Sequence, residues 1–288
     1  MRNLRILITA LVIALSSLGV SAASAADLVA TNCTSASRAQ APAAQAAAAP
    51  VTVWLAGDST MANPSSGRCP VGWGSQFDAL FNSDVTVKNQ AVGGRSIQTW
   101  LYEGNVSSTK GSDGECRLTS TTYSSRWQAM LNASTGMKAG DYLFIQFGIN
   151  DSSSTCPRHV GPARYQQLMT QMAQAALARG AHPVLLTPVA AITCSGSTAT
   201  KNRGFVNETF AAGSATRAPV IDLQTLSVSL YNSLRFCPNT GDYGGSGPLG
   251  TFFCNDHTHF DTYGAQRVAR LVAGDVRRQN LPLAAYLT

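Results

Sequence analysis

Val51-Thr-Val-Trp-Leu-Ala-Gly-Asp-Ser-Thr60 is the most informative stretch of the chain for the fold class. Its first six residues are apolar or β-branched, which is typical of a buried strand. Gly57-Asp58-Ser59 follows at once, so Ser59 is predicted to stand at the carboxyl end of that strand. Open α/β sheets bind their ligands at this edge. We therefore expect Ser59 to lie in a functional site.

Short apolar runs alternate with helical stretches along the rest of the chain. The clearest helix is predicted over 161–179, where Tyr165, Leu168 and Met172 recur at helical spacing. Alternating strands and helices predict an α/β protein, a three-layer α/β/α sandwich around a mostly parallel five-stranded sheet. Strands are expected at 51–56, 85–89, 141–147, 183–187 and 219–222, and helices at 73–82, 96–102, 161–179, 203–216 and 261–279.

The N-terminal residues have the pattern of a targeting segment. Residues 1–25 combine Arg2 and Arg5 with a short apolar core and Ala23-Ser-Ala25, as in a secretory signal peptide. Residues 26–50 are an Ala-rich, low-complexity linker, and 51–288 has the length of one domain. We expect a secreted, extracellular monomer that has no membrane contact after the signal is cleaved.

Charge and cysteine content limit the partners. The net charge of +6 is spread along the chain, so we predict no nucleic-acid binding. Seven cysteines in a secreted chain predict disulfides, and we expect sequence neighbours to pair, with Cys33 left over. The expected pairs are Cys69–Cys116, Cys156–Cys194 and Cys237–Cys254. The chain has four histidines and no Cys-x-x-Cys, so no metal site is predicted.

A base and its orienting group are available in Asp256-His-Thr-His259. A serine hydroxyl is a poor nucleophile unless a base takes its proton and a third group holds the base. His259 is the candidate base and Asp256 the candidate orienting group, since two side chains three residues apart on a turn can converge. His257 is the competing base, and a structural role for either histidine stays open.

Two further stretches, Gly93-Gly-Arg-Ser96 and Gly148-Ile-Asn-Asp151, supply candidate donors for an oxyanion. The candidates are the backbone N–H groups of Ser59 and Gly94 and the side-chain amide of Asn150. A plain turn at Gly94 and a loop cap at Asn150 are the alternative interpretations. Asp58 and Asp151 are expected to be structural, although a paired-carboxylate glycosidase would place two acids in the same way.

Taken together, these stretches resemble the GDSL-type SGNH hydrolases, and within them the rhamnogalacturonan acetylesterases. The matching pieces occur in the family's order, as Leu55-Ala-Gly-Asp-Ser-Thr-Met-Ala62, Gly72-Trp-Gly74, Ala91-Val-Gly-Gly-Arg-Ser96, Gly140-Asp-Tyr-Leu-Phe-Ile-Gln-Phe-Gly-Ile-Asn-Asp151 and Asp256-His-Thr-His259. The resemblance implies a flavodoxin-like sandwich and favours His259 over His257, because Asp-x-x-His is the family spacing. One residue departs from the pattern: Ile149 stands where the similar acetylesterases have a histidine.

The resemblance also implies the activity. We predict a secreted carbohydrate esterase that removes acetyl groups from a plant cell-wall polysaccharide such as rhamnogalacturonan, without a cofactor. The expected catalytic residues are Ser59, His259 and Asp256, and Trp100 is a candidate for stacking on a sugar. Two alternatives remain, a lipase or thioesterase for longer acyl chains and a non-catalytic carbohydrate-binding protein.

Overall fold

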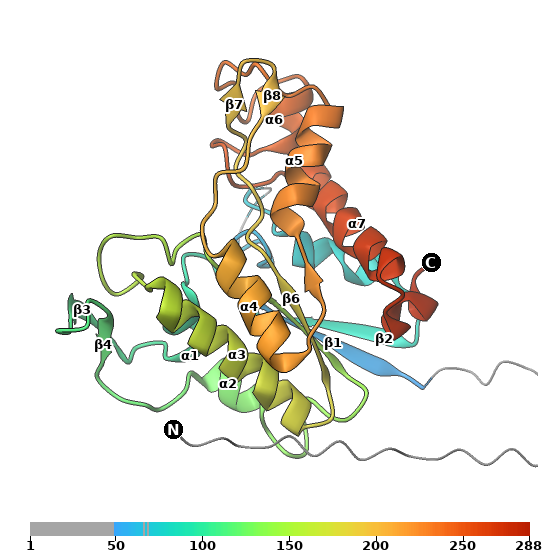
Figure 1. The fold of residues 1–288 in the computed structure, drawn as a ribbon. Helices are drawn as coiled ribbons and strands as arrows, with labels where there is room; N and C mark the ends of the chain where they lie inside the picture. Colours follow the sequence, from blue (N-terminus) through green and yellow to red (C-terminus); the bar gives the residue numbers. More distant parts are fainter. Residues whose placement is uncertain (1–48, 66, 68) are drawn as a thin grey trace, which may run out of the picture. The chain divides into compact units, whose positions relative to one another are not determined.

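A parallel sheet runs through the centre of the computed structural model, which describes residues 49–65, 67 and 69–288 (Figure 1). Its strands are β1 Val51–Gly57, β2 Val85–Asn89, β5 Tyr142–Gln146, β6 His182–Leu186 and β9 Val220–Ile221. They lie in the order β2-β1-β5-β6-β9, and every neighbouring pair is parallel. The predicted strands are confirmed, and the sheet is parallel throughout.

The N-terminal predictions fall outside this description. The signal peptide and the linker up to residue 48 lie beyond the described residues, as does Cys33. Residues Ala47–Thr288 form a unit of their own. Within the described part, no helix is long and apolar enough to cross a membrane.

The two faces of the sheet bury different side chains because a strand alternates its residues between faces. On β1, Trp54 and Ala56 belong to one hydrophobic cluster, and Val53 and Leu55 belong to the other. The first cluster is covered by α1 Ile97–Leu101, α2 Ser125–Met130, α3 Pro162–Ala178 and α4 Val206–Thr216 (Figure 1). These helices form one outer layer of the sandwich.

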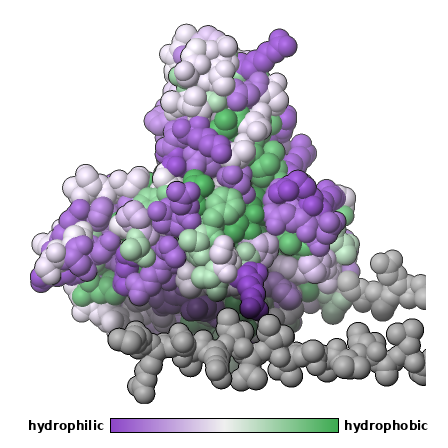
Figure 2. All heavy atoms as spheres, in the orientation of Figure 1, coloured by the Kyte–Doolittle hydropathy of each residue, from purple (hydrophilic) through white to green (hydrophobic). Residues whose placement is uncertain are grey.

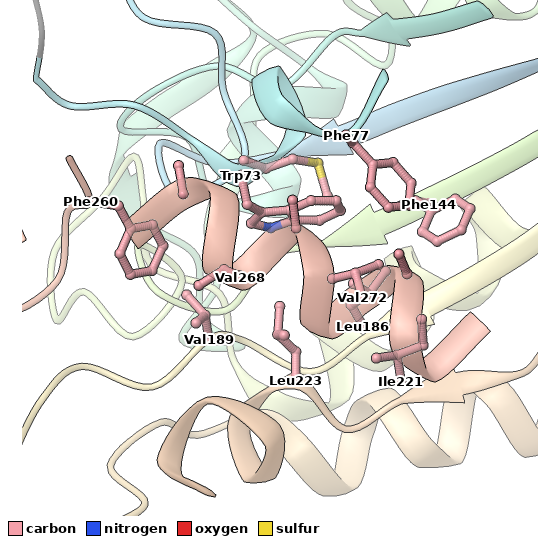
Figure 3. Packing of buried hydrophobic residues seen from close by; sticks show 14 of the residues in the cluster. Trp73, Phe77, Phe144, Leu186, Val189, Ile221, Leu223, Phe260, Val268 and Val272 are labelled. Atoms are coloured by element: carbon pink, nitrogen blue, oxygen red, sulfur yellow. The ribbon is translucent and has the colours of Figure 1, made fainter. Parts of the chain in front are cut away.

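The opposite face is covered mainly by α5 Leu223–Ser233 and α7 Thr262–Arg278. Figure 3 shows α7 running between Trp73 on one side and Leu223 on the other, with Val268 and Val272 on the helix. The C-terminal 3-10 turn, η3 Pro282–Tyr286, completes this layer. The packing of α7 brings the residues just before it to the carboxyl edge of the sheet, where Ser59 also lies.

Four of the five predicted helices are confirmed, and one is wrong. Residues 73–82 form two 3-10 turns, η1 Trp73–Gln76 and η2 Asp78–Leu80, rather than one helix. Gly74 accounts for part of this difference, because glycine is a poor helix former. Helix α5 was not predicted, although Asp222 caps it by accepting a hydrogen bond from the Thr225 N–H.

Several short elements in the loops were also missed. Two antiparallel hairpins are present, one from β3 Val106–Lys110 and β4 Cys116–Leu118, the other from β7 Cys194–Ser195 and β8 Thr198–Ala199. A short helix, α6 Pro248–Phe252, lies between α5 and α7. Figure 2 shows hydrophilic residues over much of the face in view, interrupted by a hydrophobic area near its middle.

The predicted disulfide pairing is wrong. The bonds join Cys69 to Cys254, Cys116 to Cys156 and Cys194 to Cys237. Neighbours in sequence were expected to pair, but the fold brings the segment before α7 against the loop after β1, where the Val71 N–H donates to the Phe260 carbonyl. Cys69 therefore meets a cysteine 185 residues away.

Candidate active site

Ser59 is presented by a tight turn at the end of β1. The Asp58 carbonyl accepts hydrogen bonds from the N–H groups of Met61 and Ala62, which turns the chain away from the sheet. The Asp58 side chain is fully buried, and its Oδ1 accepts from the Thr60 N–H and hydroxyl at 2.9 and 2.7 Å. Asp58 thus stiffens the turn from below, while Ser59 stays half-buried.

Ser59 forms a hydrogen-bonded chain with residues almost at the other end of the sequence. Its Oγ lies 2.8 Å from His259 Nε2, and His259 Nδ1 lies 2.6 Å from Asp256 Oδ2. A carboxylate at Nδ1 requires the proton there, so Nε2 is left to accept the proton of the Ser59 hydroxyl. These are the contacts that a serine nucleophile, a base and an orienting group need.

The Asp256 carboxylate is held independently of the imidazole. Its Oδ1 accepts from the backbone N–H groups of Thr258 and His259, both at 2.7 Å. Burial by itself raises the pKa of Asp256, but the hydrogen bonds from the His259 side chain and backbone outweigh it and lower the pKa below its ordinary value. Asp256 therefore stays ionised at neutral pH and can stabilise a positively charged imidazolium.

Three candidate hydrogen-bond donors lie in loops near Ser59: the N–H groups of Ser59 and Gly94 and the Asn150 amide. The Asn150 Nδ2 donates to the Arg95 carbonyl at 3.1 Å, which joins the loop after β5 to the loop after β2. Gly94 has φ +74°, and a Cβ placed on Gly93 would lie 3.6 Å from Ser59 Cβ, so this loop runs close to the serine. Among the described residues, neither the Ser59 nor the Gly94 backbone N–H donates a hydrogen bond. Both are free to receive a negative oxygen.

Comparison with known proteins agrees with this geometry. Residues 55–267 match the model of the GDSL-like Lipase/Acylhydrolase family. The chain belongs to this family. It is 32% identical to rhamnogalacturonan acetylesterase RhgT of Bacillus subtilis over 83% of this chain and 94% of that protein. It is 30% identical to the probable rhamnogalacturonan acetylesterase YesY of the same organism, over 80% and 94%.

A solved structure has a similar fold. The crystal structure of Bacillus subtilis YxiM superposes with a TM-score of 0.62 at 26% identity, covering 81% of this chain and 57% of that one. The GDSL-family protein is thus a serine-dependent carboxylic ester hydrolase built on a three-layer α/β/α sandwich.

Asp151 of this GDSL-family esterase joins the loop after β5 to the start of α1. Its fully buried carboxylate accepts from the Ile97 N–H through Oδ1 and from the Gly148 N–H through Oδ2, both at 2.8 Å. Burial raises the pKa of Asp151 to about 7, against the opposing effect of these two hydrogen bonds. Since Asp58 and Asp151 are both fully buried, neither faces a cleft, and the paired-carboxylate glycosidase interpretation is wrong.

The expected role of Trp100 in binding sugar is also wrong. The Trp100 side chain has no exposed surface, and it packs against Trp127 and Phe147 with ring centroids 5.9 Å apart in each pair. Its indole N–H donates to the Gln90 carbonyl at 2.9 Å. A buried ring has no free face for a ligand, so Trp100 supports the helical layer behind the site.

Two residues near the site, His257 and Ile149, were also considered in the sequence. His257 is exposed, and its carbonyl accepts from the Ile192 N–H while its ring lies 6.2 Å from that of Tyr243. Among the described residues, Ser59 forms its hydrogen bond with His259 and not with His257. Ile149, at the position of the family histidine, is partly buried against the core.

Sequence reasoning missed Gln146, a buried polar residue under the nucleophile turn. Its Nε2 donates to Thr60 Oγ1 at 2.6 Å, and its Oε1 accepts from the Trp73 indole N–H at 2.7 Å. Thr60 in turn donates to Asp58, so one chain of hydrogen bonds connects β5 to the turn of Ser59. A glutamine inside the apolar run of β5 was the available signal, because buried polar groups require partners.

A cavity of about 620 Å³ opens beside the imidazole. Asp256 and His259 form part of its wall, and the Cys69–Cys254 disulfide forms another part. Its remaining lining residues are Pro70, Gly244, Phe253, Asn255 and Asp261. The cavity thus places polar and apolar groups beside the candidate base.

Proposed function

We propose that this esterase removes acetyl groups from a plant cell-wall polysaccharide, with rhamnogalacturonan as the substrate. The observation that carries the proposal is the hydrogen-bonded chain from Ser59 through His259 to Asp256. The substrate is proposed from the similarity to two rhamnogalacturonan acetylesterases, one of them a probable one, at 32% and 30% identity. The partner is therefore an acetylated polysaccharide, and the protein is proposed to act as a monomer.

In the proposed acylation step, Ser59 Oγ attacks the carbonyl carbon of the acetyl ester while His259 Nε2 takes the hydroxyl proton. The carbonyl oxygen becomes an oxyanion, which the N–H groups of Ser59 and Gly94 and the Asn150 amide stabilise. The bond from the carbonyl carbon to the sugar oxygen then breaks. That oxygen leaves as a hydroxyl with the proton from His259, and an acetyl group remains on Ser59.

Deacylation follows the same route with water as the nucleophile. His259 takes a proton from water, and the resulting hydroxide attacks the acetyl carbon. The second oxyanion collapses and breaks the bond to Ser59 Oγ, which recovers its proton from His259. Acetate leaves, and the site returns to its starting state without a cofactor.

Secretion is part of the proposal. The signal-peptide pattern of residues 1–25 supports it, and so do the three disulfides among the described residues, since such bonds persist in oxidising compartments. Mass spectrometry of protein recovered from the culture medium would test it. A mature N-terminus near residue 26 is the expected result, and intact protein retained in the cell is the contrary one.

The activity is tested by acetate release from acetylated rhamnogalacturonan, with acetylated xylan alongside and Ser59→Ala as the control. Acetate release from rhamnogalacturonan that disappears in Ser59→Ala supports both the serine mechanism and the proposed substrate. Release from xylan alone keeps the mechanism and changes the substrate. No release from either polymer, together with turnover of a long-chain p-nitrophenyl ester, favours the lipase alternative.

A further inference from the structure

Arg203 connects the end of β6 to the turn that carries Asp256 and His259. Its Nη2 donates to Thr258 Oγ1 at 3.0 Å, and its Nε donates to the Val189 carbonyl at 3.2 Å. Thr258 lies between Asp256 and His259 in the sequence, and its side chain is buried. Its N–H donates to Asp256 Oδ1. A displacement of Arg203 is therefore transmitted to the residues that orient the imidazole.

The position of Arg203 is itself fixed by α5. Gln224 is 2% exposed, and its Oε1 accepts from the backbone N–H groups of Asn202 and Arg203 at 2.9 and 2.8 Å. The Gln224 Nε2 donates to the Arg203 carbonyl at 3.2 Å. The backbone of Arg203 is clamped on both sides, so its guanidinium reaches Thr258 from a rigid base.

The charge of Arg203 acts on two carboxylates that flank the serine. Burial lowers the pKa of the Arg203 guanidinium, while the negative charges of Asp58 and Asp256 act in the opposite direction. Among the residues that the structure describes, Arg203 makes no ion pair with a carboxylate within 4.0 Å. Its positive charge therefore acts on the negative charges of Asp58 and Asp256 without direct contact. Its hydrogen bonds go to neutral oxygens.

From these contacts we infer that Arg203 is a positioning residue of the esterase reaction. Its guanidinium holds the Asp256–His259 turn in register with Ser59 and supplies a positive charge that offsets Asp58 and Asp256. The inference rests on the proposed function, because it assigns meaning to the catalytic roles of Ser59, His259 and Asp256.

The charge has a predictable effect on the base. The ionisable groups around His259 are Asp256 on its own turn, Asp58 behind Ser59, Arg203, His257, Tyr243 of the preceding loop and Asp261 at the start of α7. Removing the cation leaves the field of the carboxylates unopposed, which favours positive charge beside Ser59. A protonated His259 cannot take the proton from Ser59, so the acid limb of the rate profile moves toward higher pH.

The test compares Arg203→Met, Arg203→Lys and a matched control on p-nitrophenyl acetate from pH 4 to 9. Arg179 provides the control, because its guanidinium also donates to neutral backbone carbonyls, those of Met137, Leu131 and Asn132, at the far end of α3. Arg179→Met is expected to lower the thermal midpoint and leave kcat and the acid limb unchanged.

Arg203→Met is expected to lower kcat about 10–100-fold, the range for a slightly misplaced catalytic group. Its acid limb should move up by about half a pH unit, less than the shift caused by charges in direct contact. Arg203→Lys keeps the charge but cannot reach both acceptors, so kcat should fall while the acid limb stays at its wild-type pH. This difference between two variants is one that a purely structural role would not produce.

An acid limb of Arg203→Met at the wild-type pH would overturn the inference, and so would a wild-type kcat in Arg203→Lys. If Arg203→Met does not fold, Arg203→Lys alone decides through its kcat. The proposed function fails separately, if Ser59→Ala keeps its activity. A dead Ser59→Ala with an unimpaired Arg203→Lys removes only the role of Arg203.

Discussion

Replacing Asp256 by asparagine should disable the imidazole without disturbing the turn that holds it. The carboxylate Oδ1 accepts from the N–H groups of Thr258 and His259, and an asparagine Oδ1 can accept from the same groups. The other carboxylate oxygen, 2.6 Å from His259 Nδ1, becomes an NH₂ donor. Two donors cannot face each other, so His259 must carry its proton on Nε2, the atom that faces Ser59.

The magnitude follows from this change of tautomer. An imidazole that presents N–H to the serine cannot act as its base, and such a substitution lowers kcat by about 10⁴ in a serine triad. That factor corresponds to about 5 kcal/mol of activation free energy. The stability cost is small because the backbone contacts remain and the carboxylate is more than a third exposed. We expect about 1 kcal/mol, or a fall of about 2–4 °C in the thermal midpoint.

The assay is steady-state hydrolysis of p-nitrophenyl acetate, with thermal unfolding measured on the same preparations. Asp242→Asn is the matched control, because Asp242 is an exposed carboxylate before α6 whose hydrogen bond comes from Thr240. The control should keep its activity. A loss of less than about tenfold in Asp256→Asn with normal stability would refute the orienting role of Asp256.

Three further predictions concern other parts of the site and its support. Asn150→Ala should lower kcat by about 10²–10³ with a smaller effect on KM, measured on the same ester, and an unchanged kcat would remove Asn150 from the oxyanion site. Asp151→Asn tests the raised pKa of the Asp151 carboxyl group. The folded protein keeps the proton of this group up to about pH 7, whereas the unfolded chain keeps it only up to about pH 3.8. The stability that this group gives the wild type is therefore lost as the pH rises from 3.8 to about 7. The unfolding free energy of Asp151→Asn should therefore improve relative to wild type over that interval, by at most about 4 kcal/mol in urea titrations, and a constant difference would contradict the shift. Replacing Cys194 and Cys237 by serine opens a loop of 43 residues and should cost up to about 4 kcal/mol, or about 10 °C, by calorimetry; an unchanged midpoint would show that the bond adds no stability.

Local sequence patterns were enough to predict the strands and the main candidate residues of the site. Ser59 and Asn150 each follow an apolar run, and the parallel arrangement of β1 and β5 brings such residues to one edge. The Asp256–His259 pair was recognisable because its members are three residues apart on one turn. Predictions were wrong where a residue's role depends on a distant partner, as for Trp100, whose indole packs against Trp127 and Phe147.

Short-range patterns were sufficient to predict the α/β class, the order of the motifs and the chemistry that they offer, because strand period and motif spacing are properties of short segments. The cysteine pairs, the burial of Asp58 and Asp151, and the contacts of Gln146 and Arg203 behind Ser59 and His259 became visible only in the folded chain. The strand order β2-β1-β5-β6-β9 and the packing of α7 set these contacts. They join residues up to 200 positions apart, and no local pattern records such a distance.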